Sequence, residues 1–86
     1  MRQPDDDVAT AVVLIVAEPG KESDVYRSLL GIPEVTEQML LFGEYDLFAK
    51  IECTDFGLLG SIVINQIRSI DGVDSTKTLT AAPLLD

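Results

Sequence analysis

The feature that most constrains the fold is a ten-residue apolar run near the start of the chain, VATAVVLIVA at residues 8–17. Apolar and β-branched residues occupy both alternating sets of positions, which is typical of a strand covered on both faces. The run is too short to cross a bilayer, and the acidic residues before it do not resemble a signal peptide. Residues 8–17 therefore predict a strand covered on both faces, in a soluble, cytoplasmic protein without membrane partners.

The next part of the chain predicts a helix followed by a hairpin. Apolar residues recur at helical spacing over residues 21–30, and Gly31 ends that pattern. Residues 35–42 then predict a strand that is exposed at its start and buried at its end, and residues 46–53 predict another. Gly43 supplies the backbone freedom of the turn between these two strands.

The last third of the chain repeats the order of helix and strand. Between residues 56 and 70, apolar residues at steps of three and four predict one amphipathic helix of about four turns. Its expected core stripe is Phe56, Leu59, Val63, Ile67 and Ile70. Gly72 ends this helix, and residues 73–82 predict the fourth strand.

The order βαββαβ predicts an α+β fold, a ferredoxin-like sandwich in which two helices cover one face of a four-stranded antiparallel sheet. Helices on one face bury only half of residues 8–17. The other face is an apolar area that a monomer rarely exposes, so we expect dimers that associate through their sheets. Residues 8–86 are expected to form a single domain, preceded by a disordered acidic leader at residues 1–7.

Composition excludes several classes of function. Fifteen acidic and six basic side chains give a net charge of −9, which repels nucleic acid and argues against direct DNA or RNA binding. The chain has no histidine and one cysteine, Cys53, so we expect no metal site and no disulfide. No catalytic constellation or phosphate-binding loop is apparent. We therefore expect a binding module that is not an enzyme and needs no cofactor.

The hairpin turn carries the most informative polar residues. Tyr45 and Asp46 stand at the start of an apolar strand, where a phenol and a carboxylate on a rigid rim can recognise a small polar ligand. The alternative is that Asp46 bonds its own turn amides while Tyr45 covers a sheet edge. Spacing alone leaves both interpretations open.

Three motifs together resemble one family. The turn Gly43-Glu44-Tyr45-Asp46, the Gly72-Val73 pair that follows the second helix, and Thr76-Lys77-Thr78 in the last strand are similar to the effector-binding (RAM) domain of the Lrp/AsnC transcription regulators. The resemblance runs from Val8 to Ala82. It implies a βαββαβ fold, homodimers that form through their sheets, assembly of four dimers into an octamer, and amino-acid effectors bound where dimers meet.

Positions carried over from the family give the implied ligand-binding residues. They are Leu40, Gly43, Glu44, Tyr45 and Asp46 on the hairpin, and Phe56, Leu79, Thr80 and Ala81 on the second helix and last strand. Turn amides would hold the ligand's carboxylate and Asp46 its ammonium group, while the last-strand residues are open to contribution from a neighbouring subunit. Core packing is the alternative role for Phe56 and Leu79. Residue 42 is Phe where many members carry a small hydroxyl residue, so the resemblance does not name the effector.

No winged helix-turn-helix precedes the first strand, so the expectation is a stand-alone effector domain that binds no DNA by itself. It would sense an amino acid or related metabolite and act on full-length Lrp/AsnC regulators by co-assembly. Two alternatives stay open. One is an ACT-like amino-acid-binding module, because Pro19-Gly20 resembles its ligand loop. The other is a small dimeric ferredoxin-like enzyme of the monooxygenase type.

Overall fold

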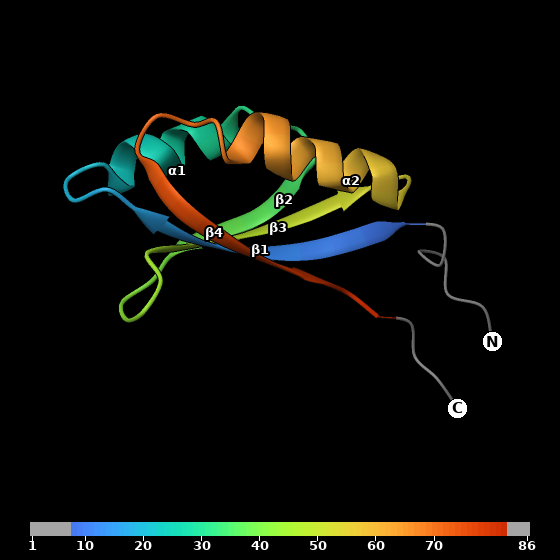
Figure 1. Cartoon of the computed structure of the whole chain (residues 1–86), viewed down its shortest axis with the longest axis horizontal. Coiled ribbons are helices and arrows are strands. Elements are labelled where there is room, and N and C mark those ends of the chain that lie inside the picture. The colour runs from blue at the N-terminus through green and yellow to red at the C-terminus, as the bar shows by residue number, and fades with distance from the viewer. Residues whose placement is uncertain (1–7, 83–86) are drawn as a thin grey trace.

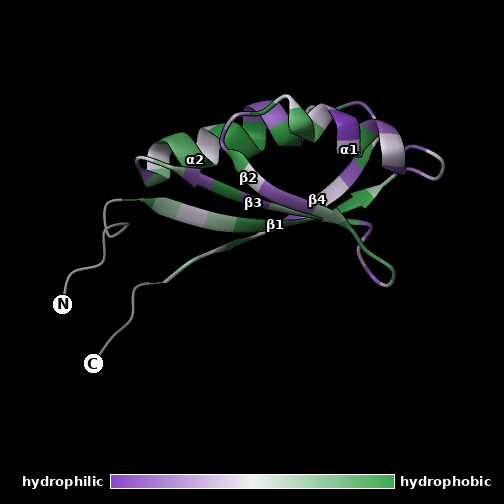
Figure 2. Cartoon of the chain, turned by 180° about the vertical axis from the view of Figure 1, so that it is seen from behind, coloured by the Kyte–Doolittle hydropathy of each residue, from purple (hydrophilic) through white to green (hydrophobic). Residues whose placement is uncertain are grey.

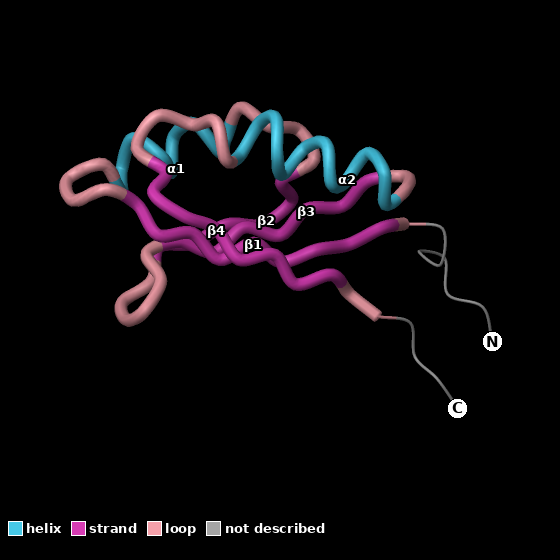
Figure 3. Tube along the Cα trace, viewed as in Figure 1, coloured by secondary structure: helices cyan, strands magenta, loops and turns pink. Residues whose placement is uncertain are grey.

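A computed structural model of the chain describes residues 8–82; the predicted leader at residues 1–7 and the last residues, 83–86, lie outside the described part. The elements are β1 (Ala9–Ala17), α1 (Glu22–Leu30), β2 (Val35–Leu40), β3 (Leu47–Cys53), α2 (Phe56–Ile62), the π-helix η1 (Val63–Ile67) and β4 (Val73–Thr80). The four strands form one antiparallel sheet in the order β2-β3-β1-β4. Both helices lie on one face of it (Figures 1 and 3), so the predicted ferredoxin-like fold is confirmed.

The central position of β1 follows from its two-sided apolar pattern. Ala11, Val13 and Ile15 are buried against the helices, whereas the residues between them are only half-buried on the open face of the sheet. In β3, the buried residues Leu47 and Ile51 pair with Ile15 and Ala11 and extend the same core. The helices therefore cover one half of the apolar residues in β1 and leave the other half on the open face, as predicted.

The core is aliphatic and lies between the sheet and the helix layer. The hydropathy colouring of Figure 2 shows the hydrophobic residues along β1. The largest fully buried side chains of the core include Ile15 and Leu47 from the sheet, Leu29 from α1, and Ile62 and Ile67 from the second helical segment. Burial of each such side chain contributes roughly 1.5–3 kcal/mol. Within residues 8–82, no buried side-chain polar atom lacks a hydrogen-bond partner.

Gly72 brings the start of β4 close to the end of β1. Its φ of +102° lies in the left-handed region, and a Cβ placed there would be 2.8 Å from Cβ of Lys21. The Gly72 carbonyl accepts a 2.7 Å hydrogen bond from the amide of Glu18. This position therefore requires glycine for conformation and for space, in addition to its expected role after the helix.

The second helix differs from the prediction of one regular helix with a single stripe. After α2 the chain widens into η1, where the amide of Arg68 donates to the carbonyl of Val63, five residues earlier, at 2.9 Å. The extra residue in that turn changes which side chains face the sheet. Ile62 is buried and Phe56 is 60% exposed, so the expected stripe is wrong at its first residue. Ile70 lies beyond η1 and packs, partly buried, against the core as expected.

Strand β2 is also shorter and more exposed than predicted. It ends at Leu40, which is 54% exposed, and Phe42 beyond it is fully exposed. The expectation of a buried strand end is wrong because β2 is an edge strand and its chain leaves the sheet there. Residues 41–46 form a loop that projects away from the helix layer (Figure 1).

Candidate functional site

The hairpin loop that carries the predicted ligand residues is anchored at its end by Asp46. The amide of Leu41 donates to the carbonyl of Asp46 at 2.8 Å, and the amide of Asp46 donates to the carbonyl of Ile15 at 2.8 Å. Gly43 has a φ of +135°, which confirms that the turn uses its backbone freedom. The loop is therefore a projecting turn on a fixed base.

The carboxylate of Asp46 does not bond its own turn amides, so that alternative from the sequence is wrong. Its Oδ2 accepts a 2.8 Å hydrogen bond from the amide of Ala17, at the end of β1, and no turn amide within residues 8–82 donates to it. This bond joins residues 29 positions apart, and only the folded sheet brings them together. The other oxygen, Oδ1, has no donor among the described residues, so one side of the carboxylate can still accept a bond from a ligand.

The rest of the hairpin group is open to solvent. Gly43 and Glu44 are exposed, Tyr45 is half-buried, and Leu40 is the exposed end of β2. A ligand resting on these residues would be covered on one side only. Small-molecule sites usually bury most of the ligand, so the hairpin provides at most half of a site within one subunit.

The other predicted residues, Phe56, Leu79, Thr80 and Ala81, lie at the opposite end of the sheet. Thr80 pairs with Ala11 in β1, whereas Asp46 is bonded to Ala17. Six residues of strand separate these two points, a distance of roughly 20 Å. Figure 1 shows the hairpin at one end of the molecule and the last residues of β4 at the other. Within one chain the two groups of predicted residues do not meet.

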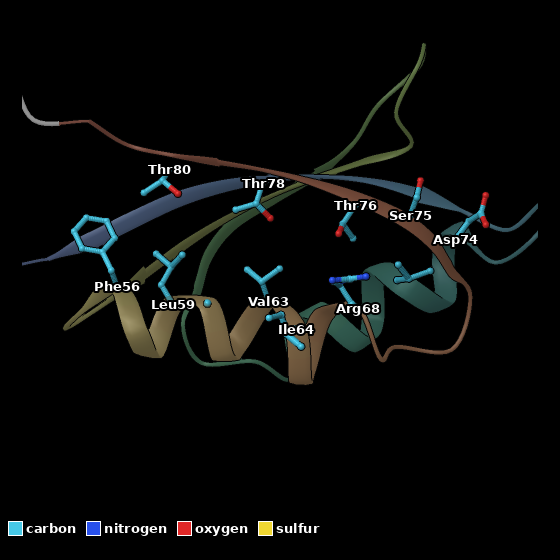
Figure 4. A pocket seen from close by; sticks show the side chains of 12 residues that line it. Phe56, Leu59, Val63, Ile64, Arg68, Asp74, Ser75, Thr76, Thr78 and Thr80 are labelled. Carbon is cyan, nitrogen blue, oxygen red and sulfur yellow. The ribbon is translucent and has the colours of Figure 1, made fainter.

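The second group is itself divided between two faces of β4. Thr80 faces the helix side, because its partner Ala11 is buried there, and Leu79 points to the open face, where it is 49% exposed. Phe56 is exposed beside Thr80 (Figure 4). Core packing, the alternative role for Phe56 and Leu79, is therefore wrong.

A cleft of ≈ 690 Å³ lies between the second helical segment and β4. Apolar side chains of α2 and η1 form one wall, and Thr76, Thr78 and Thr80 form the other (Figure 4). The sequence pattern of residues 73–82 does not indicate which side of the strand faces the helices. Arg68 also lines the cleft, and no sequence motif singled it out.

Residues 8–82 contain neither a membrane-spanning helix nor a cluster of metal ligands. No helix there has both the length and the apolar character needed to cross a membrane. No three His, Cys, Asp or Glu side chains in that range cluster in a way that would hold a metal ion.

Comparisons with known proteins agree with the geometry. The family model of the Lrp/AsnC ligand binding domain matches residues 10–82. Regulatory protein AsnC of Escherichia coli K12 is 32% identical over 73 residues, which are 85% of this chain and 48% of that protein. The crystal structure of FFRP-DM1 superposes with a TM-score of 0.83 at 36% identity, covering 86% of this chain and 99% of that one.

A more distant structure shares the fold. It is the L-Met complex of the transcriptional regulator NMB0573 from Neisseria meningitidis, with a TM-score of 0.82 at 20% identity, covering all of this chain and 58% of that one. This chain thus spans about half the length of the curated regulators that it matches. It belongs to the Lrp/AsnC family and corresponds to the ligand-binding domain of its transcription regulators.

Proposed function

We propose that this chain senses an amino acid or a related small metabolite at an interface between two subunits of its own oligomer. The observation that carries the proposal is the distance of roughly 20 Å along β1 between the hairpin residues and the Phe56–Thr80 group. Each group is open to solvent on the side where a ligand would rest. Two incomplete half-sites at opposite ends of one molecule form a complete site when one subunit presents its hairpin to the other end of a neighbour.

The chemistry of the two halves suits an amino acid. Amides of the projecting turn are suited to bind a carboxylate, and Oδ1 of Asp46 is positioned to accept a bond from an ammonium group. Phe56 and Thr80 of the neighbouring subunit would cover the ligand's side chain. The L-Met complex of NMB0573 supports the choice of ligand class, because that regulator shares the fold.

A sheet-to-sheet homodimer would bring the subunits together first. Val12, Leu14 and Val16 of β1 lie on the open face with Phe48 of β3, and none of them is covered by a helix. Packing of this face against a second copy would remove these half-buried apolar side chains from water. Because both hairpins of such a dimer remain free, further contacts between dimers can build a ring of four.

The family also suggests how the signal is passed on. The curated relatives are transcription regulators about twice as long as this chain. A domain that forms the same sheet-to-sheet contacts can join such regulators in mixed oligomers and alter their effector response. We propose this co-assembly as the route from ligand to transcription, with DNA contacts made by the longer partner.

The experiment begins with a thermal-shift screen of the twenty amino acids, and the one giving the largest stabilisation is taken forward to calorimetry. Two variants are then prepared, Asp46→Ala in one half-site and the double variant Phe56→Ala with Thr80→Ala in the other. Neither oligomer alone should bind. After the two are unfolded and refolded together, random mixing should restore about a quarter of the sites, because each site takes its halves from different subunits.

The matched control is the mixture of each variant with itself, which should stay inactive. Absence of any stabilising amino acid would contradict the sensing role. Binding that stays lost in the mixed oligomer, with both parents folded, would show that one subunit supplies the whole site.

A further inference from the structure

We propose a second small-molecule site, contained within one subunit, at the Arg68 end of the cleft between η1 and β4, and that it binds a short aliphatic carboxylate. This site goes beyond the intersubunit site above. It needs no neighbouring chain, and its ligand needs no ammonium group.

The cleft exists because the helix-side residues of β4 differ in chemistry from those of the adjacent strand. On the helix side, the adjacent strand β1 carries the buried residues Val13 and Ile15, whereas their partners in β4 are Thr78 and Thr76. A row of threonines leaves this side of β4 partly exposed to solvent and lined with both methyl and hydroxyl groups. With ≈ 690 Å³ of space, the cleft lies within the usual range for small-molecule sites.

On the opposite wall, a glycine leaves space in the cleft and lowers the stability of the helix. Gly60 lines the cleft, and a Cβ placed there would meet nothing within 4 Å, so packing within the chain does not require glycine. Glycine in a helix costs about 1 kcal/mol relative to alanine. The segment that follows is a π-helix, an irregularity found often at functional sites. Both features keep the cleft wide beside the apolar side chains of Val63 and Ile64.

Arg68 defines the class of ligand. Its side chain points into the cleft toward Thr76, whereas Asp74, which lines the same end of the cleft, points its carboxylate away from Arg68 (Figure 4). Lys21, Arg27 and Lys50 are all in ion pairs, but no carboxylate among the described residues pairs with Arg68. A guanidinium next to an apolar wall matches a molecule with a carboxylate at one end and a branched hydrocarbon at the other.

The test uses sodium 4-methylpentanoate as the probe, because it has a carboxylate and a branched chain but no ammonium group. The assembled protein, with labelled Ile, Leu, Val and Thr methyl groups, is titrated and followed by NMR. We expect saturable shifts at Val63, Ile64, Thr76 and Thr78 in the millimolar range, which is ordinary for a ligand of about eight heavy atoms. The uncharged 4-methylpentanamide should bind about tenfold more weakly.

Variants separate the cleft from other surfaces. Arg68→Gln should weaken binding about tenfold or more, and Arg68→Lys should restore part of it. Gly60→Leu directs a side chain into empty space and should abolish binding while methyl signals outside the cleft stay unchanged. Arg27→Gln, an exposed arginine on α1, is the matched control and should bind as the wild type does.

Three outcomes would overturn the proposal. They are shifts confined to the hairpin or the open sheet face, equal affinity in Arg68→Gln and wild type, and undiminished binding in Gly60→Leu. Phe56 and Thr80 of the proposed intersubunit site line the other end of the same cleft, so variants must tell the two sites apart. Arg68→Gln should leave binding of the screened amino acid unchanged, and Asp46→Ala should leave binding of 4-methylpentanoate unchanged.

Discussion

The role of Asp46 can be decided by comparing two substitutions, one that keeps the hydrogen-bond acceptor of its side chain and one that removes it. Oδ2 of Asp46 accepts the amide hydrogen of Ala17, which is buried at the end of β1. Asp46→Asn keeps an oxygen that can accept this bond and removes only the charge. Asp46→Ala removes the acceptor and leaves a buried amide without a partner.

The two effects on stability differ in size. An unsatisfied buried donor costs about 1–3 kcal/mol, so Asp46→Ala should lower the free energy of unfolding by that amount. For a domain of this length, 1 kcal/mol corresponds to a Tm change of about 4–8 °C. Asp46→Asn replaces a charged acceptor by a neutral one and should lower the free energy of unfolding by about 1 kcal/mol or less. Urea denaturation checks both values, and Glu44→Gln in the same loop, an exposed carboxylate, should be neutral.

Ligand binding gives the second half of the comparison. If Oδ1 of Asp46 also binds a ligand ammonium group, both substitutions should lower the affinity for the screened amino acid by about tenfold to a hundredfold. This loss is equivalent to about 1.5–3 kcal/mol of binding free energy. Calorimetric titration of folded Asp46→Asn is the deciding measurement. Wild-type affinity in that variant would refute the ammonium contact and leave Asp46 as the residue that positions the hairpin on β1.

Three further predictions concern the fold and assembly. Gly72→Ala should destabilise the protein by about 1–2 kcal/mol or more in urea denaturation, because alanine resists φ near +102° and its Cβ would approach Lys21. Gly60→Ala is the contrasting substitution, because the space beside Gly60 is empty, and it should stabilise the protein by up to about 1 kcal/mol. Ile67→Ala should cost about 2–5 kcal/mol, since that side chain is fully buried beneath η1; a loss below 1 kcal/mol would contradict the described packing. Leu14→Lys should give monomers by light scattering at concentrations where the wild type is dimeric, and persistence of the dimer would exclude the open sheet face as the interface.

Local patterns were sufficient to predict the order of elements. The apolar run at residues 8–17 predicts a strand, and β1 covers Ala9–Ala17 in the interior of the sheet. Asp55 is the N-cap of α2, and its carboxylate accepts the amide hydrogen of Leu58 at 2.7 Å. These features depend on neighbouring residues, so periodicity and capping chemistry are enough to find them.

Features that depend on distant contacts were not predictable in this way. The Asp46–Ala17 bond joins two strands whose pairing exists only in the folded sheet. The π-turn at Val63 adds one residue to a pattern that otherwise fits a regular helix, and helical spacing alone does not reveal it. Arg68 lacks any motif, and its place in the cleft follows from that turn. The ligand roles of the nine carried-over residues stay predictions.

The geometry of the half-sites also limits how subunits can assemble. A sheet-to-sheet contact is isologous, because each subunit presents the same open face, and it therefore closes at two copies. A hairpin that meets the Phe56–Thr80 end of a neighbour is a heterologous contact, since it joins different surfaces, and it continues until a ring closes. The two contacts use different parts of the chain, the open face on one hand and the two ends of the sheet on the other. In the proposed assembly, a ligand bound at the heterologous contact would stabilise the ring without changing the dimer, so effector concentration is predicted to set the number of dimers in the assembly.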